Sequence, residues 1–365
     1  MMKFAKHFLI LICIFSTSCR MQSVSDSTTH PLVAAILSDK ALPEYGRLAS
    51  HTEPSINGDI YIIGGEKACK ALSSVLLNYD AHNNVTGRHV PDGLPDFAGE
   101  TVAMVIDDAA FPYWDFIQEN GQEKMREHFL RLALSSLDTL SNLSVYDLEG
   151  KGRRDDAKII IIADPYYLSW GKKDVDFLFE NTLCRVPVLQ PSDLLFEKLF
   201  SDPPAELNVG ILCDSVFTRS SVYTECLKAQ AGRPDVGSFA ASPVAGKSAL
   251  FSFLDLYRTN GGRAPINVLL VDDPTVDMDS LNKDLVKSKN LNRPEYLTYG
   301  KLLSDDLRII ESSDVVSDFC YSFLREYNLF THKIAYPKLV SFRTSSIPDS
   351  ESQDFLILQS DDVQD

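Results

Sequence analysis

The stretch Lys158-Ile159-Ile160-Ile161-Ile162-Ala163 decides the fold class of this chain of 365 residues. Four consecutive isoleucines leave no polar face, which is typical of a strand covered on both sides in a parallel sheet. A strand with one wet face would instead alternate apolar and polar residues. The stretch therefore predicts a parallel sheet with helices on both of its faces.

The same combination of short apolar strands and amphipathic helices extends along the chain on either side. Before and just after the isoleucine run, the pattern predicts strands at 59–63, 101–106 and 186–189 and helices at 66–79, 122–140 and 173–182. Farther along it predicts strands at 207–212, 237–241 and 266–271, helices at 220–231, 247–257, 278–289 and 314–327, and extended pieces at 336–358. Strands that alternate with helices indicate βαβ units and an α/β fold.

The best internal boundary is Ser201-Asp202-Pro203-Pro204, because two prolines interrupt both helices and strand ladders. We expect two Rossmann-like lobes with a central cleft, an N-terminal lobe at 57–203 and a C-terminal lobe at 204–365 with possible crossover segments. Each lobe has an ordinary domain size. A single ten-stranded sheet is the alternative.

The N-terminus has the features of a secretory signal. Lys3 and Lys6 precede the apolar run 8–15, and small residues lead to Cys19, in an order that resembles a bacterial lipobox. We expect a signal peptide at 1–18, lipidation of Cys19 and a flexible tether at 19–56, with a plain signal peptide as the alternative. No Asp follows Cys19, so anchoring on the periplasmic side of the outer membrane is expected.

Charge and cysteine content exclude several classes of function. The formal net charge is −16, which disfavours nucleic acid as a partner. It also disfavours binding to anionic membranes through a basic patch, so we expect the lipid on Cys19 to make the membrane contact. Five cysteines remain after Cys13 and Cys19, with no CxxC metal pattern and no disulfide framework.

Residues that directly follow the predicted strands are the candidate ligand-binding residues, because ligands of open parallel sheets bind at the carboxyl ends of the strands. They are Asp107, Asp108, Tyr113, Trp114, Asp164, Tyr166, Asp214, Arg219 and Asp272. Aromatic faces stack on rings, and carboxylates accept hydrogen bonds from hydroxyl or ammonium groups. The structural alternative is that the acids cap helices and the aromatic residues cover the lobe.

The motifs of common cofactors and nucleophiles are missing. After Gly64-Gly65 no dinucleotide fingerprint follows, Ala245-Gly246-Lys247-Ser248 is an incomplete phosphate loop, and no hydrolase elbow occurs. His82, His89, His128 and His332 show no metal-ligand spacing. We therefore predict no cofactor, no metal and no catalytic residue.

The predicted anchor, tether and two βαβ lobes, with acidic and aromatic residues at the strand ends, resemble the type I periplasmic binding proteins. The resemblance is architectural and covers about residues 57–340. It implies two hinged lobes that close on a sugar, amino acid or nucleoside and present it to a membrane transporter or sensor. In that case Tyr113, Trp114, Asp164 and Tyr166 line one wall, and Asp214, Arg219 and Asp272 line the other.

Two other functions stay open beside this solute-binding lipoprotein, although the sequence favours binding over catalysis. One is an α/β enzyme with an interdomain active site, either a hydrolase with Asp107 or Asp164 as base or a racemase. A racemase of the aspartate/glutamate type needs a cysteine from each domain, and Cys184 and Cys213 lie in different halves without that family's Cys-Asn-Thr context. The other is a structural or partner-binding lipoprotein.

Overall fold

A computed structural model describes residues 29–204, 207–215, 217–219, 221–232, 236–290, 292, 295–347 and 354–360, without the side chain of Arg219. The predicted signal peptide and Cys19 lie outside these residues. Within them, no helix combines the length and the apolar character needed to cross a membrane.

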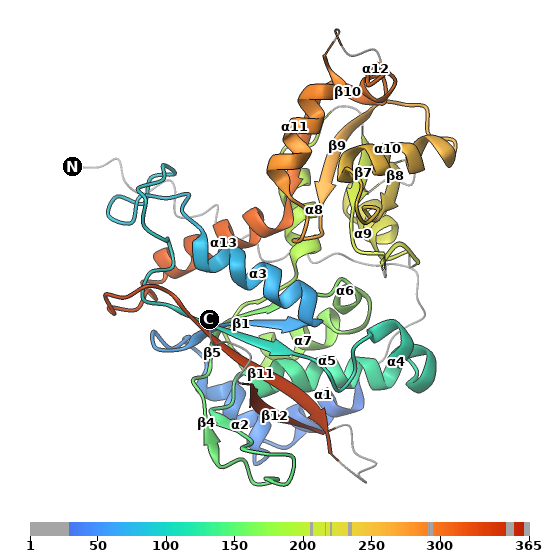
Figure 1. Ribbon diagram of the computed structural model, residues 1–365. Coiled ribbons are helices and arrows are strands. Elements are labelled where there is room, and N and C mark those ends of the chain that lie inside the picture. The colour runs from blue at the N-terminus through green and yellow to red at the C-terminus, as the bar shows by residue number, and fades with distance from the viewer. Residues whose placement is uncertain are drawn as a thin grey trace, which may run out of the picture.

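The chain forms two α/β lobes, each built on its own sheet (Figure 1). The first sheet has the strand order β12 (Phe355–Ser360), β11 (Lys338–Ser346), β2 (Thr101–Ile106), β1 (Asp59–Gly64), β5 (Ala157–Ile162) and β6 (Val188–Leu189). Its pairs are parallel except the edge pair of β11 with β12. The second sheet, with all pairs parallel, has the order β10 (Leu303–Glu311), β9 (Ile266–Val271), β7 (Asn208–Leu212) and β8 (Gly237–Ala241). A short hairpin of β3 (Leu140–Ser141) and β4 (Gly152–Arg153) completes the strands.

Helices cover both faces of the sheets, as the isoleucine-rich β5 requires. They are α1 (Pro31–Ser38), α2 (Pro43–Ser50), α3 (Glu66–Asn78), α4 (Tyr113–Asn120), α5 (Gln122–Ser136), α6 (Tyr166–Trp170), α7 (Lys172–Thr182), α8 (Pro191–Ser201), α9 (Val222–Ala231), α10 (Ala249–Thr259), α11 (Met278–Ser288), α12 (Leu297–Gly300) and α13 (Ser312–Glu326), with a 3₁₀ turn η2 (Phe217–Arg219). On β5, Ile159 and Ile161 face a core shared with α3 and α13, whereas Ile160 and Ile162 face a core shared with α5 and α7. The predicted α/β class, with parallel sheets flanked by helices, is confirmed.

The two lobes share one apolar core. The cluster that contains Tyr166 and Phe129 of the first lobe continues through Phe196 of α8 to Ile211 and Tyr223 of the second lobe. The chain passes from the first sheet to the second through α8 and returns through α13, and these two helices pack against each other (Figure 1).

The tether predicted at 19–56 is wrong for the described residues of that range. Helices α1 and α2 pack on α5 and α7, and Val33, Ile36 and Leu48 are fully buried. Proline stands in the first turn of each helix, where its fixed φ and missing N–H are tolerated. These two helices therefore belong to the first lobe.

The predicted C-terminal lobe at 204–365 is also too long. Strand β11 pairs in parallel with β2, and β12 pairs with β11, so the end of the chain completes the first sheet (Figure 1). The apolar residues Leu339, Val340 and Phe342 are consistent with the extended piece predicted there, but they do not show which sheet it joins.

Candidate functional site

Acidic residues from both sheets gather at the carboxyl ends of the central strands. Asp107 follows β2 and Asp164 follows β5 after one residue, whereas Asp214 follows β7 after one residue and Asp272 directly follows β9. The ionised forms of Asp107, Asp214 and Asp272 all act on Asp164, so acids of the two lobes lie within electrostatic range of one another. We call Asp107, Asp164, Asp214, Asp272 and Asp273 the interlobe acid cluster.

Asp107 is fully buried and held in its ionised form. His128 of α5 contacts its Oδ2 at 2.6 Å, and the Thr344 hydroxyl of β11 donates to its Oδ1 at 2.6 Å. Burial opposes the charge of Asp107, but the charge and hydrogen bond of His128 and the bond from Thr344 outweigh it and lower its pKa. Asp107 therefore orients His128, and its negative charge acts on Asp164.

Asp164 is the acid with the strongest preference for its protonated form. Its side chain is buried, and its Oδ1 accepts a hydrogen bond of 2.8 Å from the backbone N–H of Tyr166 at the start of α6. Burial, followed by the charges of Asp107, Asp214 and Asp272, raises its pKa to about 8. At neutral pH Asp164 is therefore a proton donor, in spite of the helix-capping bond.

Asp272 is the corresponding acid of the second lobe. Ser192 of α8 and the Tyr223 hydroxyl of α9 both donate to its Oδ2, Tyr223 at 2.7 Å. Burial raises its pKa to about 6 against these hydrogen bonds, which favour the carboxylate. Near neutral pH Asp272 is therefore largely ionised and able to accept a proton.

Lys67 joins the two lobes across the acid cluster. It lies in the first turn of α3, and its Nζ is 3.0 Å from Asp214 Oδ2 and 3.4 Å from Asp273 Oδ2 in the second lobe. Although desolvation favours the neutral amine, the two carboxylates keep the pKa of Lys67 above its ordinary value. Asp273 is fixed further by Thr275, whose N–H and hydroxyl both donate to its Oδ1.

Aromatic residues form one wall beside Asp164. Tyr113 and Tyr166 are fully buried, and the ring of Trp114 stacks on Tyr166 with centroids 6.0 Å apart. Tyr166 also meets Phe217 of the second lobe edge-on at 5.6 Å. Asp164 is buried as these tyrosines are, which is consistent with its raised pKa.

Not every predicted residue joins the cluster. Asp108 is exposed and forms a surface ion pair with Arg343, whose guanidinium also contacts Glu66. The backbone of Arg219 ends η2, but its side chain lies outside the described part of the chain. A ligand-binding role of the nine predicted residues stays a prediction.

Several residues of the site were missed from the sequence. Lys67 comes just after the Gly64-Gly65 turn, so it could have been found by extending the strand-end search to β1. His128 shows no metal-ligand spacing, and its contact with Asp107, 21 residues away, is not visible in the local sequence. Thr344 was missed because its strand was assigned to the other lobe.

Two cysteines lie close to the acid cluster: Cys69 is within electrostatic range of Asp107 and Asp164, and Cys213 is within range of Asp272, Asp214 and Asp273. The five cysteines of the described residues are free and buried, and burial raises the pKa of Cys184 to about 11 and that of Cys213 well above its usual range. Thiolates are thus disfavoured.

No protein-family model matches the chain, and neither does any curated protein. Solved structures with a similar arrangement include glutamate and aspartate racemases. Isoform RacE1 from Bacillus anthracis is 12% identical with a TM-score of 0.49 over 79% of this chain and 89% of that one. The enzyme from Francisella tularensis subsp. tularensis SCHU S4, in complex with D-glutamate, is 15% identical with a TM-score of 0.48 over 80% of this chain and 89% of that one. The aspartate racemase of Picrophilus torridus is 13% identical with a TM-score of 0.35 over 75% and 99%.

These neighbours correct the resemblance stated from the sequence. They are racemases and not periplasmic binding proteins, so the predicted membership in the type I binding proteins is wrong. The predicted solute-binding and transport function depended on that membership and is wrong with it. The function of this chain is therefore argued from its own side chains.

Proposed function

We propose that this protein is an enzyme that moves protons on a small polar substrate held at the interlobe acid cluster, with Asp164 and Asp272 as the two acid–base groups. The observation that carries the proposal is that one buried carboxyl group from each lobe stands at the end of a central strand, in electrostatic contact with the other. Burial of unpaired carboxyl groups is unfavourable for folding, and it is typical of sites that use them in catalysis.

The two groups occupy opposite protonation states over a common pH range. Asp164 is protonated below about pH 8 and Asp272 is ionised above about pH 6, so between these values one donates a proton while the other accepts one. A pair of this kind supports inversion at a carbon centre: one carboxylate removes the proton from a C–H bond, and the opposite carboxyl group returns a proton to the other face. The reaction is balanced in protons and requires no redox partner.

The charges of the site indicate the substrate class. Asp214, Asp273 and Asp272 favour an ammonium or hydroxyl group, whereas Lys67 is the nearby cation that attracts a carboxylate. A small α-amino or α-hydroxy acid carries both kinds of group next to an acidic C–H bond. We therefore propose racemisation or epimerisation of such an acid.

Exchange of substrate hydrogen with solvent tests the proposal across a whole class of compounds at once. The protein is incubated in D₂O with a panel of single-enantiomer α-amino and α-hydroxy acids, and loss of the Cα–H signal is followed by NMR. We expect exchange with one group of related compounds. Asp164→Asn and Asp272→Asn should each slow it by about 10²–10⁴-fold, the usual contribution of a general acid or base.

Asp108→Asn is the matched control, since it makes the same chemical change at an exposed acid just past the carboxyl end of β2. It should retain the exchange rate of the unchanged protein. Exchange that survives Asp164→Asn and Asp272→Asn would overturn the assignment of these residues. No exchange with any compound of the panel would overturn the substrate class and, with it, the proposed reaction.

A further inference from the structure

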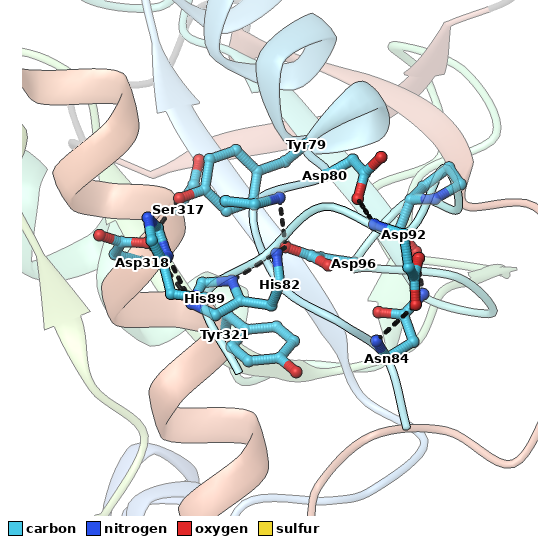
Figure 2. Close-up of polar contacts among 12 residues, drawn as sticks. Tyr79, Asp80, His82, Asn84, His89, Asp92, Asp96, Ser317, Asp318 and Tyr321 are labelled. Atoms are coloured by element: carbon cyan, nitrogen blue, oxygen red, sulfur yellow. Dashed lines mark hydrogen bonds and ion pairs between the residues drawn. The ribbon is translucent and has the colours of Figure 1, made fainter. Parts of the chain in front are cut away.

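A second group of chemically active side chains lies far from the acid cluster, beneath the long loop at residues 79–100. Figure 2 shows His82 and His89 of this loop converging on Asp318 of α13. The ligand atoms of these three residues lie within 4.8 Å of one another. We propose that His82, His89 and Asp318 bind a divalent transition-metal ion, Zn²⁺ in particular, with the remaining position open to water.

The distances suit one ion. His82 Nε2 is 3.4 Å from His89 Nδ1 and 3.8 Å from Asp318 Oδ1. Ligands at the usual Zn–N and Zn–O lengths in a tetrahedral site are separated by about 3.3 Å. Small side-chain rotations of exposed His89 and half-buried Asp318 are therefore sufficient to close the site on zinc.

His82 is oriented as zinc-binding histidines are. Its Nδ1 lies 3.0 Å from Oδ2 of buried Asp96, and since a carboxylate can only accept, Nδ1 donates and Nε2 presents a lone pair to the site. The ring of Tyr321 stacks on the His82 ring with centroids 3.9 Å apart and an interplanar angle of 10°, which fixes the ring plane. The Tyr79 hydroxyl in turn donates to Asp318 Oδ1 at 2.5 Å.

The loop that carries both histidines is held in place before any ion binds. Both oxygens of Asp80 accept backbone N–H groups of residues 92 and 93, and Asp96 accepts those of residues 81 and 82 (Figure 2). A site with ordered ligands loses little conformational entropy on binding. Asp314, one turn before Asp318 on α13, adds negative charge close to His89.

The local spacing of His82 and His89 shows no metal pattern because the third ligand comes from a distant part of the sequence. An ion at this site would connect the loop to α13, one of the two helices through which the chain crosses between the lobes. The inference is independent of the proposed acid–base reaction, since none of these residues belongs to the interlobe acid cluster.

Zinc titration of the full chain, prepared without a histidine tag, tests this site. We expect one equivalent of Zn²⁺ to bind and to raise the melting temperature. Co²⁺ used as a spectroscopic probe should give the visible bands of a site with nitrogen and oxygen ligands. His89→Ala, a change at an exposed loop position, should weaken binding about tenfold or more, and His332→Ala, at another exposed histidine, should not.

Circular dichroism and the melting temperature in EDTA show whether each variant is folded as the unchanged protein is. Equal zinc affinity of the unchanged protein and His89→Ala would overturn the proposal, as would the absence of zinc binding to the unchanged protein. Loss of affinity in His332→Ala alone would place the ion elsewhere and overturn it as well.

Discussion

A buried ionisable residue stands at each end of strand β5, and the two residues differ in whether an opposite charge is paired with them. Near the amino end, fully buried Lys158 forms an ion pair with fully buried Glu100, and its Nζ also donates to two backbone carbonyl groups. Past the carboxyl end, buried Asp164 has no cation paired with it among the described residues, and the charges that act on it most are those of other acids. The same strand thus carries a satisfied ion pair at one end and an unsatisfied acid at the other.

This difference assigns a structural role to the Lys158–Glu100 ion pair and a chemical role to Asp164. An ion pair buried with all its hydrogen bonds adds little net stability, but it leaves no reactive group. An acid buried among acids destabilises the fold, and it gains a pKa suited to proton transfer near neutral pH. Three predictions test this division, each at a different residue.

Asp164→Asn should produce the largest change, and it should be a gain of stability. The folded protein keeps the Asp164 proton up to about pH 8, whereas the unfolded chain releases it near pH 4. The contribution of Asp164 to stability is therefore full below about pH 4 and is lost as pH rises to about 8. An asparagine does not titrate, so at pH 8 the variant should be more stable by as much as about 5 kcal/mol.

Urea unfolding of both proteins at several pH values from 4 to 9 measures this difference. It should grow with pH and then level off, and Asp108→Asn should show no such trend. A constant difference across the range would mean that Asp164 is ionised in the folded protein. The same variant is expected to lose hydrogen exchange, so activity and stability should change in opposite directions.

Lys158→Met should destabilise the protein by about 3–5 kcal/mol, because it leaves Glu100 buried without its partner. Adding Glu100→Gln should recover part of the loss, since the amide oxygen can still accept the hydrogen bond from the backbone N–H of Thr331. Chemical denaturation of both variants and of Glu100→Gln completes a double-mutant cycle. If the double variant loses more stability than the two single variants lose together, Lys158 and Glu100 do not stabilise each other as an ion pair.

The sequence predicts one end of this comparison better than the other. Four isoleucines identify β5 as a covered strand, and the strand-end rule leads directly to Asp164, Asp107 and Asp272. The rule works because parallel strands bring their carboxyl ends to one edge whatever the strand order is.

Long-range pairing limits what else can be predicted. The placement of β11 beside β2, which brings Thr344 to Asp107, depends on contacts between residues far apart in the chain. Helix α8 is not among the predicted helices, although it ends just before the Pro203-Pro204 boundary and begins at Pro191, a position where proline is well tolerated. The contact of Lys67 with Asp214 requires both lobes to be in place.

Lys67→Met should have the smallest effect on stability, because the Lys67 side chain is 60% exposed and surface ion pairs contribute about 0–1 kcal/mol. Its effect on function should be larger: if Lys67 attracts the substrate carboxylate, KM rises about tenfold while kcat changes little. Lys70→Met is the matched control, since Lys70 lies one turn later on α3, is 52% exposed and pairs with Glu66 within the same helix. Equal KM values for the two variants would assign Lys67 to the contact between the lobes alone. A rise in KM confined to Lys67→Met, with both melting temperatures unchanged, would instead place the substrate carboxylate at Lys67, next to Asp214 and Asp273 of the interlobe acid cluster.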